Sequence, residues 1–299
     1  MGKIRPGTRN RAFELVAQVV AAHGEYNAAY EAIGIATDIR RRYDEILGLL
    51  RSRYGTTSVD RQDVIKAEIE AASAEGDLVR RQGELKSAAA RLNALIGRPS
   101  LAPLAAPTGF RMLKVVGLAQ VQTLGRSANP MLALAGAQSS AAAQAKSLTD
   151  LNYYPDVNVG AKYVQRPAAE STGEFTLGVK LPLHYDVKDA EQRAAGARLS
   201  AAQARNEALR LRIDGQIADA WFGVDALRKV VQIYASRQLP PARSSVENAR
   251  NGFQAGSSDL SLLFDSERRF RAVQLDLLKL KVELQSKYAE LERLAGGSL

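Results

Sequence analysis

Few side chains of this sequence have the type and spacing that catalysis or metal binding requires. The two histidines, His23 and His184, lie far apart, and neither has carboxylate or histidine partners at the spacing of metal ligands. The serine pairs Ser244-Ser245 and Ser257-Ser258 have no candidate base in the surrounding pattern. The sequence has no cysteine, which excludes disulfides, thiolate metal sites and cysteine nucleophiles. We therefore expect no enzyme, no metal site and no cofactor.

The net charge of +9 raises the question of a nucleic-acid partner. However, the 41 lysines and arginines are interleaved with 32 aspartates and glutamates along helical segments. The densest basic groups are Arg40-Arg41-Arg42 and the spaced set Arg205, Arg210 and Arg212, and aromatic residues do not alternate with them. This pattern favours solvated helix faces over a nucleic-acid footprint, so we expect no nucleic-acid partner.

The chain contains an internal repeat. Residues 54–97 align without a gap with residues 253–296, at an offset of 199 residues. Apolar side chains recur every seventh position in both copies, which is the signal of helices that pack as coiled coils. The matched heptad positions are Val64, Ala71, Leu78, Leu85 and Leu92 in the first copy and Leu263, Phe270, Leu277, Leu284 and Leu291 in the second.

Each copy also has the sequence pattern of a helical hairpin. A long helical stretch ends at Tyr54 or Phe253, a short Gly/Ser/Thr segment follows, and Asp60 or Asp259 opens the next helix. The outgoing arm of the second copy, residues 187–253, would be about 100 Å long as a helix. Such a hairpin cannot bury its apolar stripes alone, so it requires neighbouring hairpins.

Between the hairpins the apolar period changes from helical to two. Residues 156–165 and 174–183 alternate apolar and polar side chains, which predicts two strands joined by a polar loop. One face would carry Val157, Val159, Leu177 and Val179, and the other Asn158, Lys162, Thr176 and Lys180. The pattern fits either a sheet that covers a soluble core or strands of a membrane barrel with an apolar outer face. Lys162 and Lys180 could bias a barrel lumen toward anions or simply keep a strand soluble.

The order of these elements resembles the outer-membrane efflux (TolC) family. The resemblance rests on Tyr154-Pro155-Asp156 at the first strand, on Leu181-Pro182-Leu183 at the end of the second, on Leu239-Pro240, and on the repeated hairpin tips. Tyr163–Pro167 together with Leu177–Leu183 is most similar to the CzcC/CusC branch, which serves heavy-metal efflux.

The resemblance implies a mainly α fold, with long antiparallel coiled-coil hairpins and a short β-hairpin that contributes to a trimeric outer-membrane β-barrel. It implies a first repeat at 1–100 with its tip at 54–59, a connector with a short helix at 101–129, and a second repeat at 130–299. Within the second repeat we expect a helix at 130–151, the two strands, and a long hairpin at 187–296 with its tip at 253–258.

The same resemblance implies a homotrimer in the outer membrane and periplasm that passively exports metal ions or small toxic compounds. Its partners would be a periplasmic adaptor (membrane-fusion) protein, an inner-membrane pump of the RND type, and outer-membrane lipid. In the barrel, the apolar strand face would meet lipid and the polar face would line the lumen. The adaptor would meet the tip residues, which are Tyr54, Gly55, Thr56, Thr57, Ser58, Phe253, Ala255, Gly256 and Ser257.

Two departures from the family pattern lead to further expectations. The chain has no stretch resembling a signal peptide or the family's first strand pair, so we expect an N-terminally truncated member. Arg42-Tyr43 aligns with Trp221-Phe222 but lies much nearer its tip, so the first arm is expected to be short and its tip displaced by about 30 Å. A soluble coiled-coil scaffold remains the alternative, although it would have no need for residues 156–183.

Overall fold

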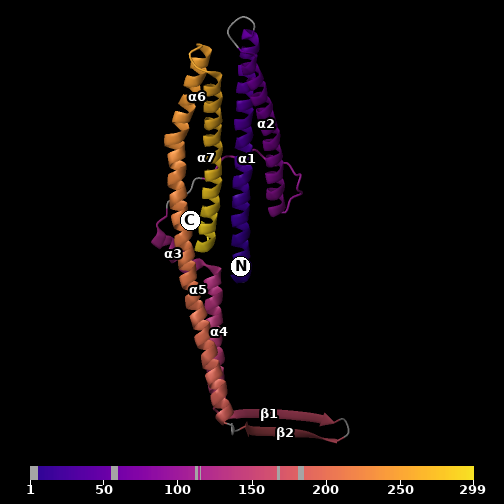
Figure 1. Cartoon of the computed structure of the whole chain (residues 1–299). Helices are drawn as coiled ribbons and strands as arrows, with labels where there is room; N and C mark the ends of the chain where they lie inside the picture. The colour runs from indigo at the N-terminus through magenta and orange to yellow at the C-terminus, as the bar shows by residue number, and fades with distance from the viewer. Residues whose placement is uncertain (1–5, 55–59, 112–113, 115, 167–168, 181–184) are drawn as a thin grey trace. The chain divides into compact units, whose positions relative to one another are not determined.

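A computed structural model describes residues 6–54, 60–111, 114, 116–166, 169–180 and 185–299. The chain divides into two units, one of residues 1–7 and 129–214 and the other of residues 8–128 and 215–299 (Figure 1). Helix α5, Tyr185–Ile233, begins in the first unit and continues in the second. None of the helices within the described residues is long and apolar enough to cross a membrane.

The first unit joins two helices to a β-hairpin. It contains α4 (Pro130–Leu151), β1 (Asp156–Arg166), β2 (Ala169–Lys180) and the first part of α5. Asn129 caps α4 by accepting a hydrogen bond from the Met131 backbone N–H at 2.9 Å, and Pro130 occupies the first turn, where its missing N–H costs nothing. Asp150 accepts hydrogen bonds from Lys146 on α4 (2.7 Å) and from Gln192 on α5 (2.9 Å), so one carboxylate joins the two helices.

The β-hairpin is antiparallel and has two chemically different faces. Val157 pairs with Val179 and Val159 with Leu177, while Asn158 pairs with Gly178. Because paired residues of an antiparallel ladder project to the same side, the apolar residues of both strands share one face. The structure thus confirms the predicted combination of a mainly α chain with a short β-hairpin.

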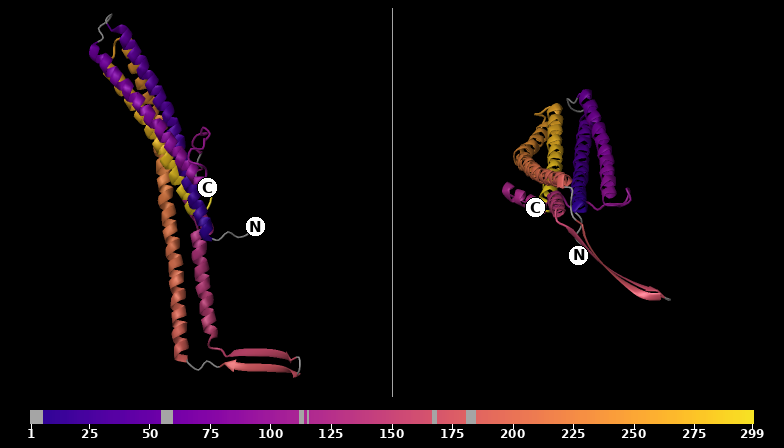
Figure 2. Two further views of the ribbon diagram at one scale, coloured as in Figure 1. Left: turned by 90° about the vertical axis from the view of Figure 1, so that its right-hand side faces the viewer. Right: turned by 90° about the horizontal axis from the view of Figure 1, so that it is seen from below.

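The second unit is built of long helices that run side by side (Figures 1 and 2). Its elements, besides the later part of α5, are α1 (Pro6–Arg53), α2 (Arg61–Leu95), α3 (Leu118–Ala128), η1 (Tyr234–Gln238), α6 (Leu239–Gln254) and α7 (Leu260–Ala295). Asp60 and Asp259 cap α2 and α7 in the same way, each accepting a hydrogen bond from the backbone N–H two residues on. In both copies of the repeat, the second helix therefore begins with the same aspartate N-cap.

An apolar cluster holds the two hairpins of this unit together. It combines Tyr43 and Leu50 of α1 with Leu260, Leu263 and Phe264 of α7, and buried alanines of α2 and α6 complete it. The Tyr43 ring meets the Phe264 ring edge to face at 5.3 Å between centroids. A separate cluster of Ala22, Tyr26, Ala88 and Leu92 closes the other end of the α1–α2 pair.

The helical path of α5 into α6 is interrupted by a short π-helix, η1. The Leu239 backbone N–H bonds to the Tyr234 carbonyl, one residue further back than in an α-helix. Pro240 and Pro241 follow directly. Prolines lack the N–H of a regular turn and their rings crowd the carbonyl four residues earlier, so the wider π turn accommodates them without ending the helix.

The expected displacement of the first tip is wrong. The Arg53 guanidinium donates a hydrogen bond to the Gln254 carbonyl at 3.4 Å, so the ends of α1 and α6 lie together. Tyr26, which lies 28 residues before Tyr54, resembles Trp221, which lies 32 residues before Phe253, because both side chains donate a hydrogen bond to a carbonyl of the connector.

We expect Leu263→Ala to lower the free energy of unfolding by about 2–5 kcal/mol, because it leaves a cavity in the cluster that joins the hairpins. Leu263 is fully buried, whereas its neighbour Leu262 is 53% exposed. Leu262→Ala is therefore the matched control, with an expected change within about 0.5 kcal/mol. Urea titrations followed by circular dichroism would measure both, and equal losses would contradict the placement of the core.

Candidate functional site

The turn between α6 and α7 is compact and exposed. Gly256 adopts φ +75°, a left-handed conformation that a side chain would strain. The Ser257 backbone N–H bonds to the Gly252 carbonyl at 2.8 Å, and the Gly256 N–H bonds to the Phe253 carbonyl at 3.2 Å. A Cβ at Gly252 would lie against the Ser258 hydroxyl, so the glycine permits this close return of the chain. Ala255, Gly256 and Ser257 are all exposed at this turn.

Only part of the first tip can be compared with this turn. Tyr54 ends the first arm with its side chain 52% exposed. The other four predicted tip residues, Gly55, Thr56, Thr57 and Ser58, lie outside the described residues. Since Arg53 reaches the Gln254 carbonyl, the predicted tip residues of the two hairpins that are described lie at one end of the second unit.

Ion pairs connect the two hairpins just behind the tips. Arg42 of α1 donates to both carboxylate oxygens of Glu267 on α7 at 3.1 and 3.3 Å. Arg250 of α6 donates to Glu45 of α1 at 2.9 Å, and Arg268 of α7 donates to Glu70 of α2. Sequence reasoning missed these pairs, because no spacing rule relates residues on separate hairpins.

Of these pairs, Arg42–Glu267 is the buried one. The Glu267 side chain is 2% exposed and Arg42 also lies over the Phe270 ring, 5.6 Å from its centroid. Burial raises the pKa of Glu267, and the charge and hydrogen bonds of Arg42 oppose that rise. Burial also raises the pKa of the neighbouring Tyr43 hydroxyl to about 12. The centre of the hairpin contact is therefore dry, and its one carboxylate depends on Arg42.

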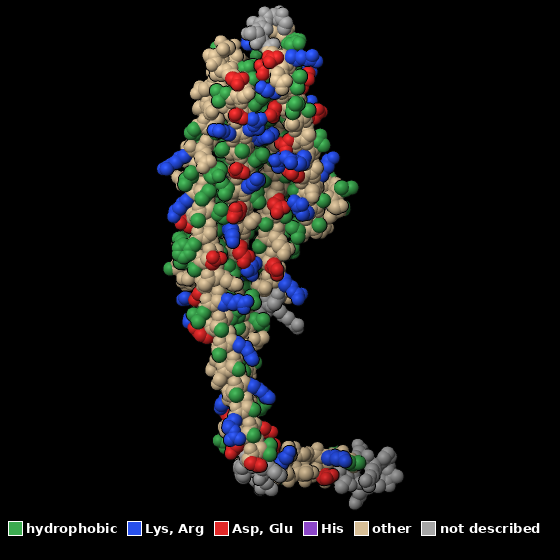
Figure 3. Space-filling model, in the orientation of Figure 1, with side chains coloured by type: hydrophobic (Ala, Val, Ile, Leu, Met, Phe, Trp, Pro, Cys, Tyr) green, Lys and Arg blue, Asp and Glu red, His purple; other side chains and the backbone are tan. Residues whose placement is uncertain are grey.

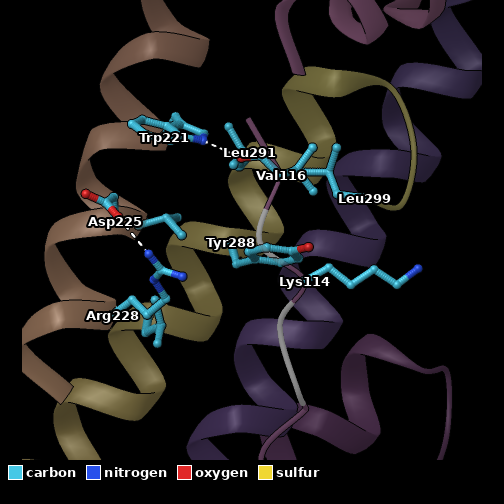
Figure 4. A pocket seen from close by; sticks show the side chains of 10 residues that line it. Lys114, Val116, Trp221, Asp225, Arg228, Tyr288, Leu291 and Leu299 are labelled. Carbon is cyan, nitrogen blue, oxygen red and sulfur yellow. Dashed lines mark hydrogen bonds and ion pairs between the residues drawn. The ribbon is translucent and has the colours of Figure 1, made fainter. Parts of the chain in front are cut away.

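The connector is fixed to the helices by two aromatic side chains. Trp221 donates from Nε1 to the Val116 carbonyl at 2.8 Å, and Tyr26 donates its hydroxyl proton to the Ala105 carbonyl at 3.1 Å. Figure 4 shows Trp221 at a cavity of about 200 Å³, across from Leu291 and Tyr288. Asp225 and Arg228 pair at the same cavity, 3.0 Å apart. The lone tryptophan of the sequence was the signal that could have indicated this anchor.

The β-hairpin carries the other predicted site residues. Val157, Val159, Leu177 and Val179 are each about three-fifths to two-thirds exposed, at 62%, 65%, 69% and 59%. On the opposite face, Lys162 pairs in register with Glu174, and Lys180 with Asp156. Each lysine thus lies opposite a carboxylate, which cancels the charge that an isolated lysine would bring to this face.

The residues considered for chemistry are dispersed. His23 lies half-buried on α1, and His184 lies outside the described residues. Ser245 donates a 3.4 Å hydrogen bond to Ser266, and within the described residues no histidine or carboxylate bonds to Ser245. Within the described residues, no group of three or more His, Cys, Asp or Glu side chains could hold a metal ion.

Comparisons with known proteins connect this architecture to a family. The sequence profile described as "Outer membrane efflux protein" matches residues 124–297. Among curated proteins, no sequence matches the chain. Solved structures of similar fold include VceC of Vibrio cholerae, with 20% identity, a TM-score of 0.78, and coverage of 98% of this chain and 72% of VceC.

Two further solved structures resemble this chain at the same sequence identity. The open-state outer-membrane channel MtrE of Neisseria gonorrhoeae has 20% identity and a TM-score of 0.79, over 98% of this chain and 68% of MtrE. CusC, whose crystal structures were described in relation to folding and transmembrane channel formation, has 20% identity and a TM-score of 0.74, over 98% and 70%. These likenesses confirm the TolC-like fold class.

The buried ion pair predicts a pH-dependent effect of Arg42→Met. Because the folded state raises the pKa of Glu267 above its ordinary 4.5, the folded chain holds this proton more tightly than the unfolded chain. The free energy of unfolding then falls as pH rises through the folded pKa, and loss of Arg42 steepens that fall. We expect Arg42→Met to cost about 3–5 kcal/mol at pH 7 and clearly less at pH 5.

The control for this measurement is Arg41→Met, which removes a guanidinium that is 65% exposed and paired within its own helix. Its expected cost is below about 1 kcal/mol at both pH values. Chemical denaturation of the three proteins at pH 5 and 7 makes the comparison. An Arg42→Met loss that does not change with pH would show that Glu267 does not depend on Arg42.

Proposed function

Because the chain belongs to the outer membrane efflux protein family, we propose that it is a subunit of a trimeric conduit and forms the outer-membrane part of a tripartite efflux pump. The family and fold make it a component of an outer-membrane efflux channel. The trimer, the periplasmic adaptor and the RND-type inner-membrane pump are parts of the proposal. In this role the protein opens a path for solutes and carries out no chemical step.

The observation that carries the proposal is the exposed apolar face of the β-hairpin. Four large apolar side chains, Val157, Val159, Leu177 and Val179, stay mostly exposed in the isolated chain. A two-stranded sheet with such a face is marginal in water, and its open edges invite pairing with further strands. Lipid outside a closed barrel would satisfy both needs, with the apolar face outward and Asn158, Lys162, Thr176 and Lys180 toward the lumen.

The proposed adaptor site is the end of the second unit that carries the tips. The α6–α7 turn presents Ala255, Gly256 and Ser257 without burying them, and a rigid, exposed turn at a helix end is a suitable docking element. We extend the site to Tyr54 and Phe253, and to Gly55, Thr56, Thr57 and Ser58. The supporting contact is the hydrogen bond from Arg53 to the Gln254 carbonyl, which brings both arms to one end.

We also propose the domain division and the branch that the sequence motifs indicate. The first repeat would span 1–100, the connector 101–129 and the second repeat 130–299. The heavy-metal branch is supported by Tyr163–Pro167 and Leu177–Leu183, whereas CusC is no more similar in overall sequence than VceC or MtrE. The cargo proposed on this basis is metal ions or small toxic compounds.

One experiment separates the conduit from a coiled-coil scaffold without a transport role. Protein purified from outer membranes in detergent would be inserted into planar bilayers, and its oligomeric state measured by light scattering. The conduit predicts stable trimers with discrete conductance steps. Trimers or dimers that remain in the soluble fraction and never conduct would favour the scaffold and refute the proposal.

The strand faces provide a matched pair of substitutions. We expect Val159→Lys to destabilise the membrane-inserted state by about 2–4 kcal/mol, because it places a charge on the lipid-facing side. Asn158→Lys, one residue away on the opposite face, should change it by less than about 1 kcal/mol. Urea titration of the folded fraction in lipid vesicles measures both, and the reverse order would assign the faces the other way.

The tip makes an independent prediction about the adaptor. We expect Ala255→Trp to weaken binding of the cognate adaptor at least tenfold while the melting temperature stays unchanged, because the turn contributes little buried surface. Lys279→Trp, on the exposed middle of α7, serves as the control for a bulky surface residue. Biolayer interferometry with the immobilised channel gives the affinities. Unchanged binding by the Ala255 variant would remove this turn from the docking site.

A further inference from the structure

Three arginines on the first part of α5 lack a partner that several other arginines of the chain have. These others pair with a carboxylate three or four residues away on the same helix, as in Arg41–Asp38, Arg80–Asp77 and Arg243–Glu247. Figure 3 shows the result over the second unit, where Lys and Arg side chains are mixed with Asp and Glu. Arg210 of α5 likewise forms an ion pair with Glu207, three residues away, at 2.7 Å.

Arg198, Arg205 and Arg212 have no such carboxylate partner. All three are exposed, and within the described residues none of them has an ion pair or hydrogen bond. Every position three or four residues from them is neutral. These neighbours are Ala194, Ala195, Ala201, Ala202, Ala208, Leu209, Gly215 and Gln216.

The spacing places the three guanidinium groups in one row, which we name the arginine ladder. Positions seven residues apart are about 10.5 Å apart along a helix and drift by only about 20° around it. The ladder therefore extends over about 21 Å on one side of α5. Neighbouring rungs lie about 10.5 Å apart, more than the Debye length of about 8 Å at physiological salt, so each guanidinium acts as a separate local charge on a solute close to it.

The partner helix of this unit cannot neutralise the ladder. The charged residues of α4 are Lys146 and Asp150, and Asp150 already accepts hydrogen bonds from Lys146 and Gln192. Packing a second copy of α4 against α5 would likewise bring no free carboxylate. In contrast, the strand lysines Lys162 and Lys180 each lie opposite an acidic residue. On α5 itself, Glu207 and Asp214 lie two residues from Arg205 and Arg212, so the positive charge is confined to the row of guanidinium groups.

We infer that the arginine ladder is a track for anionic solutes, and that anions are the preferred cargo of the conduit. The inference rests on the proposed function and narrows its cargo: small toxic compounds would pass as anions, and metal ions as complexes with anionic ligands. Guanidinium groups suit this role, because they stay charged at any physiological pH and bind carboxylate, sulfonate or phosphate oxygens with two parallel hydrogen bonds. Rungs at a regular spacing let a solute pass from one to the next.

The local field can be measured with thiol probes, because the chain contains no cysteine. Ala208→Cys places one thiol between Arg205 and Arg212, and Ala137→Cys on the uncharged middle of α4 is the matched control; both positions are exposed. A sulfonate-bearing and a trimethylammonium-bearing methanethiosulfonate are the two probes. We expect the anionic-to-cationic rate ratio to be roughly tenfold higher for the Ala208→Cys variant than for the Ala137→Cys variant.

Removal of the ladder tests whether its three arginines cause the difference in rate ratio. When Arg198→Gln, Arg205→Gln and Arg212→Gln are added to Ala208→Cys, the rate ratio should fall to that of the Ala137→Cys variant. A control triple variant, Arg41→Gln, Arg80→Gln and Arg243→Gln, loses the same charge from paired positions and should keep the high ratio at position 208. Equal ratios for the two thiol variants in the otherwise wild-type protein would overturn the ladder as an anion-attracting surface.

The reversal potential in a KCl gradient across a planar bilayer tests the cargo. We expect wild-type channels to prefer chloride and the ladder triple variant to lose that preference, with the control triple variant like wild type. A high rate ratio at position 208 with unchanged selectivity in the ladder variant would place the ladder outside the path and overturn the inference. Trimers of wild-type protein that conduct no ions would instead refute the proposed function, while the thiol rates would still report on the ladder.

Discussion

The architecture depends on one constraint: a long helical hairpin with an apolar stripe has no core of its own. Each arm exposes a line of Leu, Ala and Phe side chains that two helices cannot enclose. In this chain the second hairpin supplies the cover, through Leu260, Leu263 and Phe264 against Tyr43 and Leu50. Duplication of the hairpin is therefore a solution to burial, because each copy is the partner that the other requires.

The polar contacts depend on this apolar contact. Glu267 is buried beside Arg42, whose guanidinium lies over the Phe270 ring, and an unpaired carboxylate would be costly there. The surrounding pairs Arg250–Glu45 and Arg268–Glu70 lie nearer to water. The buried pair fixes the register of α1 against α7, because a shift of one helical turn would leave Glu267 without its cation. At this register the ends of α1 and α6 meet, where Arg53 donates to the Gln254 carbonyl, and this is the end that we propose for docking.

The surfaces to which we assign proposed functions are those that this contact leaves free. The α6–α7 turn, the apolar strand face and the arginine ladder are all exposed, and none of them contributes to the apolar clusters of the second unit. Only the apolar strand face is unfavourable for a lone chain in water. We propose a protein partner for the turn, lipid for the strand face and anionic solutes for the ladder. A passive conduit requires this arrangement, since it works by its surfaces and has no need of a reactive centre.

The sequence by itself determined the local elements and their faces. The heptads, the Asp60 and Asp259 caps and the alternation of Val157, Val159, Leu177 and Val179 depend on neighbours within a few residues, and such patterns can be read along the chain. The sequence left open what only the tertiary structure decided. Tyr26 and Trp221 both donate to carbonyls of the connector, and Arg42 and Glu267 are partners although 225 positions separate them. Contacts of this kind form when separate hairpins pack together. The packing sets the axial register, that is, which residue of one helix lies beside which residue of the other, and this register cannot be read from spacing along the sequence.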